Sequence, residues 1–117
     1  MKFKLIVVVV NAELTDTLVK VAKDAGSTGA TIIPARGTGI HEALTFFGLT
    51  LESHRSVILM VVADYCAAAI LHSIRENGHF RKPGTGIAFT VDLDKVIGLE
   101  SQLSQFDCDR MPDENLL

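Results

Sequence analysis

The stretch LIVVVVN, residues 5–11, decides the fold of this chain. Its six apolar, mostly β-branched residues in a row are typical of a β-strand that is covered on both faces. Asn11, which follows them, is a residue type that favours the start of a helix. The same succession returns as VILMVVAD, residues 57–64, with Asp64 standing 53 residues after Asn11. The chain therefore contains one strand-and-helix unit twice.

Each unit continues with a helix and a further strand. One helix is predicted from Asn11 to Gly26 and another from Asp64 to Gly78, because apolar residues recur there at helical spacing. The stripes consist of Leu14, Leu18, Val21, Ala22 and Ala25 in the first helix, and of Ala67, Ile70, Leu71 and Ile74 in the second. The strands that follow are predicted at 31–33, where Pro34 marks the end, and at 87–91.

Two such units interleave into an α+β domain of βαββαβ order, a four-stranded antiparallel sheet with both helices on one face. That arrangement leaves the other face of the sheet bare. Because the strands at 5–10 and 57–62 are apolar on both faces, the bare face needs a second cover. We expect another copy of the same chain to supply it.

Composition limits the classes of function. The 117 residues suit a single domain, and their net charge of −3 speaks against nucleic-acid binding, which needs a basic field. The first apolar run is too short to span a bilayer and lacks the pattern of a secretory signal, so a cytoplasmic location is expected. Cys66 and Cys108 show no metal or redox spacing and are expected to be free thiols.

Two Gly-Thr-Gly stretches flank predicted strands. Gly37-Thr38-Gly39 follows the strand at 31–33, and Gly84-Thr85-Gly86 precedes the strand at 87–91. Glycines let backbone N–H groups approach phosphate oxygens closely, since no Cβ intervenes. The same residues also serve ordinary tight turns, so at this point both interpretations stay open.

The stretches GATIIPARGTG (29–39) and GTGIAFTVDL (84–93) resemble the PII signal-transduction proteins and their PII-like relatives. The resemblance covers residues 1 to about 99. It implies a ferredoxin-like domain over 1–100 that assembles as a trimer, with a T-loop-like excursion at 36–55 and a C-terminal tail at 101–117. It also implies that the two glycine stretches, the T-loop base and the B-loop, meet across a subunit boundary and bind an adenine nucleotide.

The resemblance implies a set of ligand-binding residues. These are Thr31, Arg36, Gly37, Thr38, Gly39, Lys82, Gly84, Thr85 and Gly86. Four phosphate-directed cations of the family are replaced here by Ile40, Ile87, Gly98 and Glu100. We therefore expect ADP or AMP to suit the cleft better than ATP. Arg36, Arg81 and Lys82 either supply part of the missing positive charge or are solvated loop charges. No cofactor is expected to be required.

The excursion at 36–55 shows no sustained period, and a short helix is predicted within it at 42–47. It contains no tyrosine, the acceptor that some PII proteins modify, and His41 stands where many have a glutamine. Its apolar residues Phe46, Phe47 and Leu49 either tuck under the loop or contact a partner, which by resemblance is a membrane transporter or another regulated protein.

The sequence also bears on other functions. No catalytic arrangement of serine or cysteine with histidine is present, so an enzyme is not expected. One alternative is a CutA-like trimer that binds divalent metal, with ligands drawn from His41, Glu42, His54 and the tail sequence DCD at 107–109. The other is an interaction module without a small ligand, in which the glycines act only as hinges. The favoured prediction is a regulatory protein that senses an effector and controls a partner through its loop.

Overall fold

The computed structural model of the chain describes residues 2–37, 44–46, 49–51 and 53–99. The elements, in chain order, are β1 (Phe3–Asn11), a 3-10 turn (Ala12–Leu14), α1 (Thr15–Asp24), β2 (Thr31–Gly37), β3 (Leu44–Phe46), β4 (Leu49–Leu51), β5 (Ser53–Ala63), α2 (Asp64–Asn77) and β6 (Gly86–Leu93).

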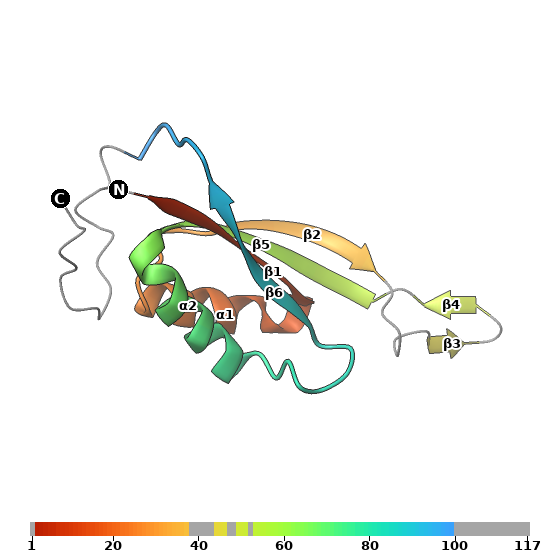
Figure 1. Cartoon of the computed structure of the whole chain (residues 1–117). Coiled ribbons are helices and arrows are strands. Elements are labelled where there is room, and N and C mark those ends of the chain that lie inside the picture. The colour runs from red at the N-terminus through yellow and green to blue at the C-terminus, as the bar shows by residue number, and fades with distance from the viewer. Residues whose placement is uncertain (1, 38–43, 47–48, 52, 100–117) are drawn as a thin grey trace.

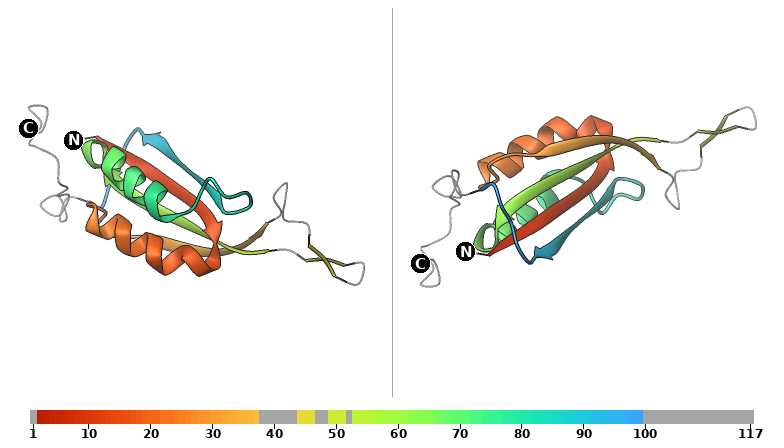
Figure 2. Two further views of the ribbon diagram at one scale, coloured as in Figure 1. Left: turned by 90° about the horizontal axis from the view of Figure 1, so that it is seen from below. Right: turned by 90° about the horizontal axis from the view of Figure 1, so that it is seen from above.

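The main sheet has four strands in the order β2-β5-β1-β6, and every neighbouring pair is antiparallel. Both helices pack on the same face of this sheet, as all three views in Figures 1 and 2 show. The βαββαβ prediction is therefore confirmed. β2 and β6, which carry the two glycine stretches, are the edge strands.

The excursion contains a second, two-stranded sheet formed by β3 and β4, with Phe46 opposite Leu49. Figure 1 shows this hairpin beyond the ends of β2 and β5. The helix predicted at 42–47 is wrong for residues 44–46, which are extended. Thr45 opposite Thr50 and Leu44 opposite Leu51 give the segment the β-branched and apolar cross-strand pairs that suit a hairpin.

The helix-covered face of the sheet holds the hydrophobic core. Successive residues of a strand face opposite sides, so every second residue of β1 and β5 points to the helices. The core comprises Ile6, Val8 and Val10 of β1, Ile58, Met60, Val62 and Ala63 of β5, Leu18 and Ala22 of α1, and Cys66, Ala67, Ile70 and Ile74 of α2. Burial of these side chains is the main term that holds the helices to the sheet.

The opposite face of the sheet is apolar and open. Ile33, Ile87, Phe89 and Val91 remain 43–60% exposed on it. The register places Ile33 and Ile87 in one cross-strand row with the two valines between them, and places Phe89 beside Val7 in the next row. The bare face predicted from the strand pattern is therefore present in the protomer.

Details at the element ends differ from the sequence prediction. Neither Asn11 nor Asp64 makes a side-chain cap bond; Asp64 is instead the first residue of α2, where a negative charge is favoured by the helix dipole. Pro34 does not end β2, which continues to Gly37. A proline is tolerated there because β2 is an edge strand. Gly26 does end α1 as predicted, with a φ of 125°.

The cysteine expectation is wrong for Cys66. Its side chain is fully buried in the core, and its sulfur is disulfide-bonded rather than a free thiol. The expected cytoplasmic location rested partly on reduced cysteines, so that support no longer applies and the location stays a prediction. No helix in the described ranges is long and apolar enough to cross a membrane.

Candidate functional site

The loop before β6 is held by the backbone of its own protomer. Gly84 has a φ of 82° and Gly86 a φ of 150°, conformations that residues with a Cβ rarely adopt. A Cβ on Gly86 would collide with the carbonyl oxygen of Val9 and lie 2.9 Å from the Cα of Val10. Thr85, the residue between the two glycines, is buried. Gly86 is thus required by close packing of the loop against β1.

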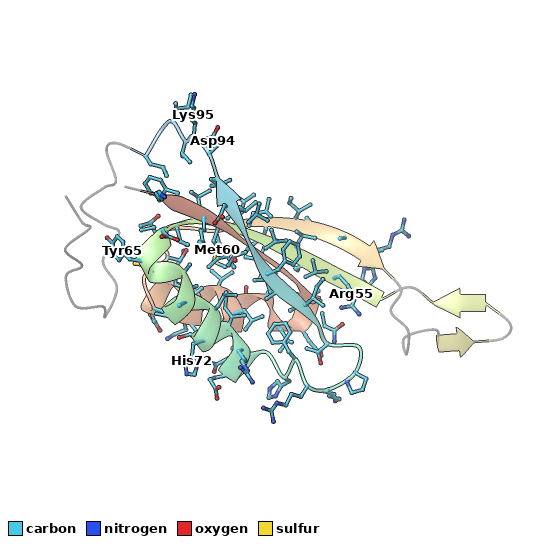
Figure 3. All side chains as sticks on the ribbon, viewed as in Figure 1. Arg55, Met60, Tyr65, His72, Asp94 and Lys95 are labelled. Carbon is cyan, nitrogen blue, oxygen red and sulfur yellow. The ribbon has the colours of Figure 1, made fainter. Side chains whose placement is uncertain are left out.

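Arg55 is the side chain that fixes this loop from the sheet side. Its Nη1 donates to the carbonyl oxygen of Thr85 at 3.1 Å, and its Nη2 donates to that of Gly84 at 3.0 Å. The backbone N–H of Asn11 donates to the same Thr85 oxygen at 3.3 Å. Figure 3 shows Arg55 near the start of β5, where the chain enters the sheet after the excursion.

Arg55 was missed as a site residue by sequence reasoning, which used it only to mark the end of the excursion. A signal was present in the stretch HRSVILMVV, residues 54–62. There a positive charge stands two residues before a run of apolar residues, so its side chain is drawn into the protein with the strand. A buried charge of that kind needs partners, and the carbonyls of the glycine loop provide them.

The other glycine stretch, at the end of β2, is built differently. Gly37 lies within the strand, and its φ is not positive. A Cβ there would make only an ordinary 3.8 Å contact with the Cδ of Arg55. Arg36 is exposed on the same edge strand, paired in register with His54, and Thr31 is exposed at the strand's other end. Thr38 and Gly39 lie outside the described residues.

The predicted ligand residues therefore gather at one end of the sheet but on its two opposite edges. Gly37 is on β2, whereas Gly84, Thr85 and Gly86 lead into β6, with β5 and β1 between them. Thr31, at the far end of β2, does not join either group. The side chain of Arg55 crosses the gap between the two glycine stretches within one protomer.

Positive charge collects beside the glycine loop on its helix side. A hollow of about 630 Å³ lies between the end of α2 and the loop that follows it. It is lined by Arg75, Glu76, His79, Phe80, Arg81 and Lys82. Three cationic residues against one acid make this a site to which an anion would be attracted in a chain whose net charge is negative.

An apolar groove continues from this hollow along α2 and β6. It has a volume of about 640 Å³ and shares Arg75 and Phe80 with the hollow. Its other lining residues are Ala68, Leu71, His72, Gly86, Ile87 and Ala88. Figure 3 shows His72 on the outer side of α2. The hollow therefore offers a region for negative charge, and the groove, which reaches Gly86, offers a region for an apolar ring.

The remaining predicted residues give less information. Phe46 and Leu49 lie in β3 and β4, and Phe47 is outside the described residues. Among the residues that the structure describes, no group of three or more histidine, cysteine, aspartate or glutamate side chains could hold a metal ion. Of the metal ligands considered above, only His54 falls in that part of the chain.

The arrangement of the helices and strands defines the class of fold. A four-stranded antiparallel sheet, two helices on one face, an open apolar face and a hairpin-bearing excursion between β2 and β5 describe a ferredoxin-like domain of the PII type. The chain belongs to the nitrogen regulatory protein P-II family, whose model matches residues 3–102. It is therefore a member of a family of regulatory signalling proteins.

Solved structures agree with this assignment. A protein from Thermus thermophilus, described as a PII-like signaling protein, is 27% identical over 80% of this chain and 88% of its own, with a TM-score of 0.60. GlnK from B. subtilis has the same fold, with a TM-score of 0.66 and 17% identity over 86% of this chain and 93% of its own. No match was found among curated proteins.

Proposed function

We propose that this chain is a PII-type signalling protein that binds an adenine nucleotide beside the glycine loop at residues 84–86 and controls a partner through its excursion at 36–55. The observation that carries the proposal is the position of Arg81 and Lys82. They line a basic hollow directly before Gly84, in a loop whose carbonyl groups are turned toward Arg55.

The assembly that completes the site is a trimer, as the resemblance to the family implies. The predicted ligand residues occupy the two edge strands of one protomer, so neither edge can form a full site by itself. A neighbouring copy that packs on the open sheet face would bring its own β2 edge toward this β6 edge. The exposed side chains of Ile33, Ile87, Phe89 and Val91 supply apolar area for that contact.

Charge favours ADP or AMP over ATP. Ile87, which stands where the family has a lysine, is 60% exposed and apolar at the start of β6. Each extra phosphate group adds negative charge that these positions cannot neutralise. The basic hollow can compensate for part of this loss, and the apolar groove along α2 and β6 can receive an adenine ring.

The excursion is the part of the chain suited to a partner. Its β3–β4 hairpin extends beyond the main sheet (Figure 1) and carries Phe46 and Leu49. In this proposal the hairpin contacts a regulated protein, of which a membrane transporter is the first candidate. The nucleotide changes that contact by shifting populations of the excursion, and no bond is made or broken.

The proposal is tested by calorimetric titration of the full chain with ATP, ADP, AMP, cyclic AMP and S-adenosylmethionine, with and without Mg²⁺. We expect micromolar binding of ADP or AMP. Binding should weaken about tenfold or more in the double variant Arg81→Ala/Lys82→Ala, because each charged hydrogen bond contributes about 1.5–3 kcal/mol. Lys20→Ala/Lys23→Ala is the matched control, since both lysines are exposed on α1 and the change in net charge is equal.

The outcomes separate the parts of the proposal. Equal weakening in both double variants would mean that only net charge matters and that the basic hollow is not the site. Tightest binding of ATP would reverse the preference for the smaller nucleotides. Flat heats across the whole panel would exclude an adenine nucleotide as the effector. Sedimentation of the same samples gives the number of chains in a particle, which should be three.

A further inference from the structure

Of the charged side chains in the described ranges, Arg55 is the one that is buried, with 8% of its surface exposed. Burying a guanidinium group is costly unless hydrogen bonds replace its lost hydration. The fork of Arg55 bonds two successive carbonyl oxygens, those of Gly84 and Thr85. A planar fork matches two neighbouring oxygens in a way that a lysine ammonium cannot.

These bonds fix the direction of two peptide groups. In a trans peptide the carbonyl oxygen and the following N–H point in opposite directions. The Gly84–Thr85 peptide is held at both ends, because its N–H donates to the carbonyl oxygen of Lys82 at 3.3 Å. The carbonyl of the Thr85–Gly86 peptide faces Arg55, so the N–H of Gly86 points away from the guanidinium. Oxygens that would repel an anion are thereby turned inward.

The same side chain also lies near Gly37, at the end of β2. Arg55 pairs in register with Ala35 on one side and Asn11 on the other, so it lies in the middle of the sheet end. Its Cδ would lie 3.8 Å from a Cβ at Gly37. Arg55 stands two residues after the start of β5, where the excursion rejoins the sheet. One side chain thus bonds the loop before β6 and lies near the end of β2.

We propose that Arg55 is the positioning residue of the effector site: it holds the loop at 84–86 in the orientation that accepts an anion. This inference rests on the proposed function, since it concerns the ligand of that site. Arg55 acts through the backbone of Gly84 and Thr85 and need not touch the ligand. The loop is then preorganised before binding, which lowers the ordering cost of binding and raises affinity.

The test compares Arg55→Lys with Ser56→Ala in the full chain. Arg55→Lys keeps the positive charge but removes the planar guanidinium group that bonds both carbonyl oxygens at once. Ser56, the next residue, faces the helices, and its Oγ accepts a hydrogen bond from Thr15 Oγ1 at 2.6 Å. Ser56→Ala therefore lowers the free energy of unfolding from an adjacent position without reaching the loop. Two quantities are measured below the unfolding transition: amide hydrogen exchange at Thr85 and Gly86 without ligand, and the affinity for ADP.

We expect Arg55→Lys to speed exchange at both amides and to weaken ADP binding about tenfold, the effect of one lost charged hydrogen bond. Ser56→Ala should lower Tm and change neither quantity. If Arg55→Lys fails to fold, Arg55→Met is measured instead, because an apolar side chain of similar length removes the desolvation cost together with the bonds.

Three results would overturn the inference. Unchanged exchange in the Arg55 variant would show that Arg55 does not hold the loop. Faster exchange with wild-type affinity for ADP would show that the bonds are structural only. An equal loss of affinity in Ser56→Ala would assign the effect to stability. In all three cases the wild type still binds ADP. If titration of the wild type with ADP gives no heat, the proposed function and this inference are both overturned.

Discussion

The two Gly-Thr-Gly stretches have the same sequence, but of Gly86 in one and Gly37 in the other, the structure requires glycine only at position 86. Before β6, Gly86 packs its Cα against the backbone of β1, where no Cβ can fit. At the end of β2, Gly37 is extended and has room for a Cβ. A glycine motif therefore does not identify a ligand site by itself. Close packing within the protomer explains why residue 86 is a glycine. It does not explain why residue 37 is one.

Gly86→Ala has the largest expected effect on stability. An alanine at a φ of 150° is strained, and its Cβ would push on the backbone of Val9 and Val10. We expect a loss of about 3 kcal/mol or more in the free energy of unfolding. Urea denaturation measures it. A loss below about 1 kcal/mol would mean that the loop can move off β1 at little cost. This variant is unsuited to testing ligand binding, because folding itself is affected.

Gly84→Ala has the next largest expected effect. With a φ of 82°, Gly84 lies in the left-handed region, where a residue with a Cβ costs about 1–2 kcal/mol. The same denaturation experiment should show a loss of that size. Gly84→Asn is the matched control, since asparagine tolerates this conformation better than alanine and should recover part of the loss. Equal losses in the two variants would argue against backbone strain as the cause.

Gly37→Ala should have the smallest effect, and of opposite sign. Its φ suits any residue and its Cβ would meet only the stem of Arg55, so alanine should stabilise the fold by up to about 1 kcal/mol through the unfolded state. If Gly37 serves a ligand, ADP affinity should fall in this variant although stability rises. A marked loss of stability would instead place Gly37 in a tight contact between copies of the chain.

The fold could be predicted from the sequence because its signals are redundant. Six apolar residues before Asn11 and six more before Asp64 specify two covered strands, and the helical stripes behind them leave one arrangement with short connections. The excursion could not be predicted in the same way. A helix at 42–47 was expected from composition, but the pairing of Leu44–Phe46 with Leu49–Leu51 depends on cross-strand contacts that no local pattern states.

The candidate site was predicted in part. Gly37 ends β2 and Gly86 begins β6, as the strand pattern suggested, and Arg81 and Lys82, which the sequence already marked as basic residues before Gly84, line the hollow. The partners of Arg55 lie about 30 residues along the chain, and its role depends on which carbonyls the fold turns toward it. The spacing of residues in the sequence does not show which way a carbonyl group points in the fold. The disulfide at Cys66 was missed for the same reason, since it depends on distance in space.

Pro34 limits how copies of this chain can join. It stands in the middle of β2, an outer strand, where it withholds one amide donor that a foreign strand would need for continuous pairing. Strand-to-strand addition at an edge has no natural end and leads to fibres, whereas packing through a face can close on itself. A single proline therefore disfavours open-ended strand pairing at this edge and leaves the apolar sheet face as the surface through which copies can join.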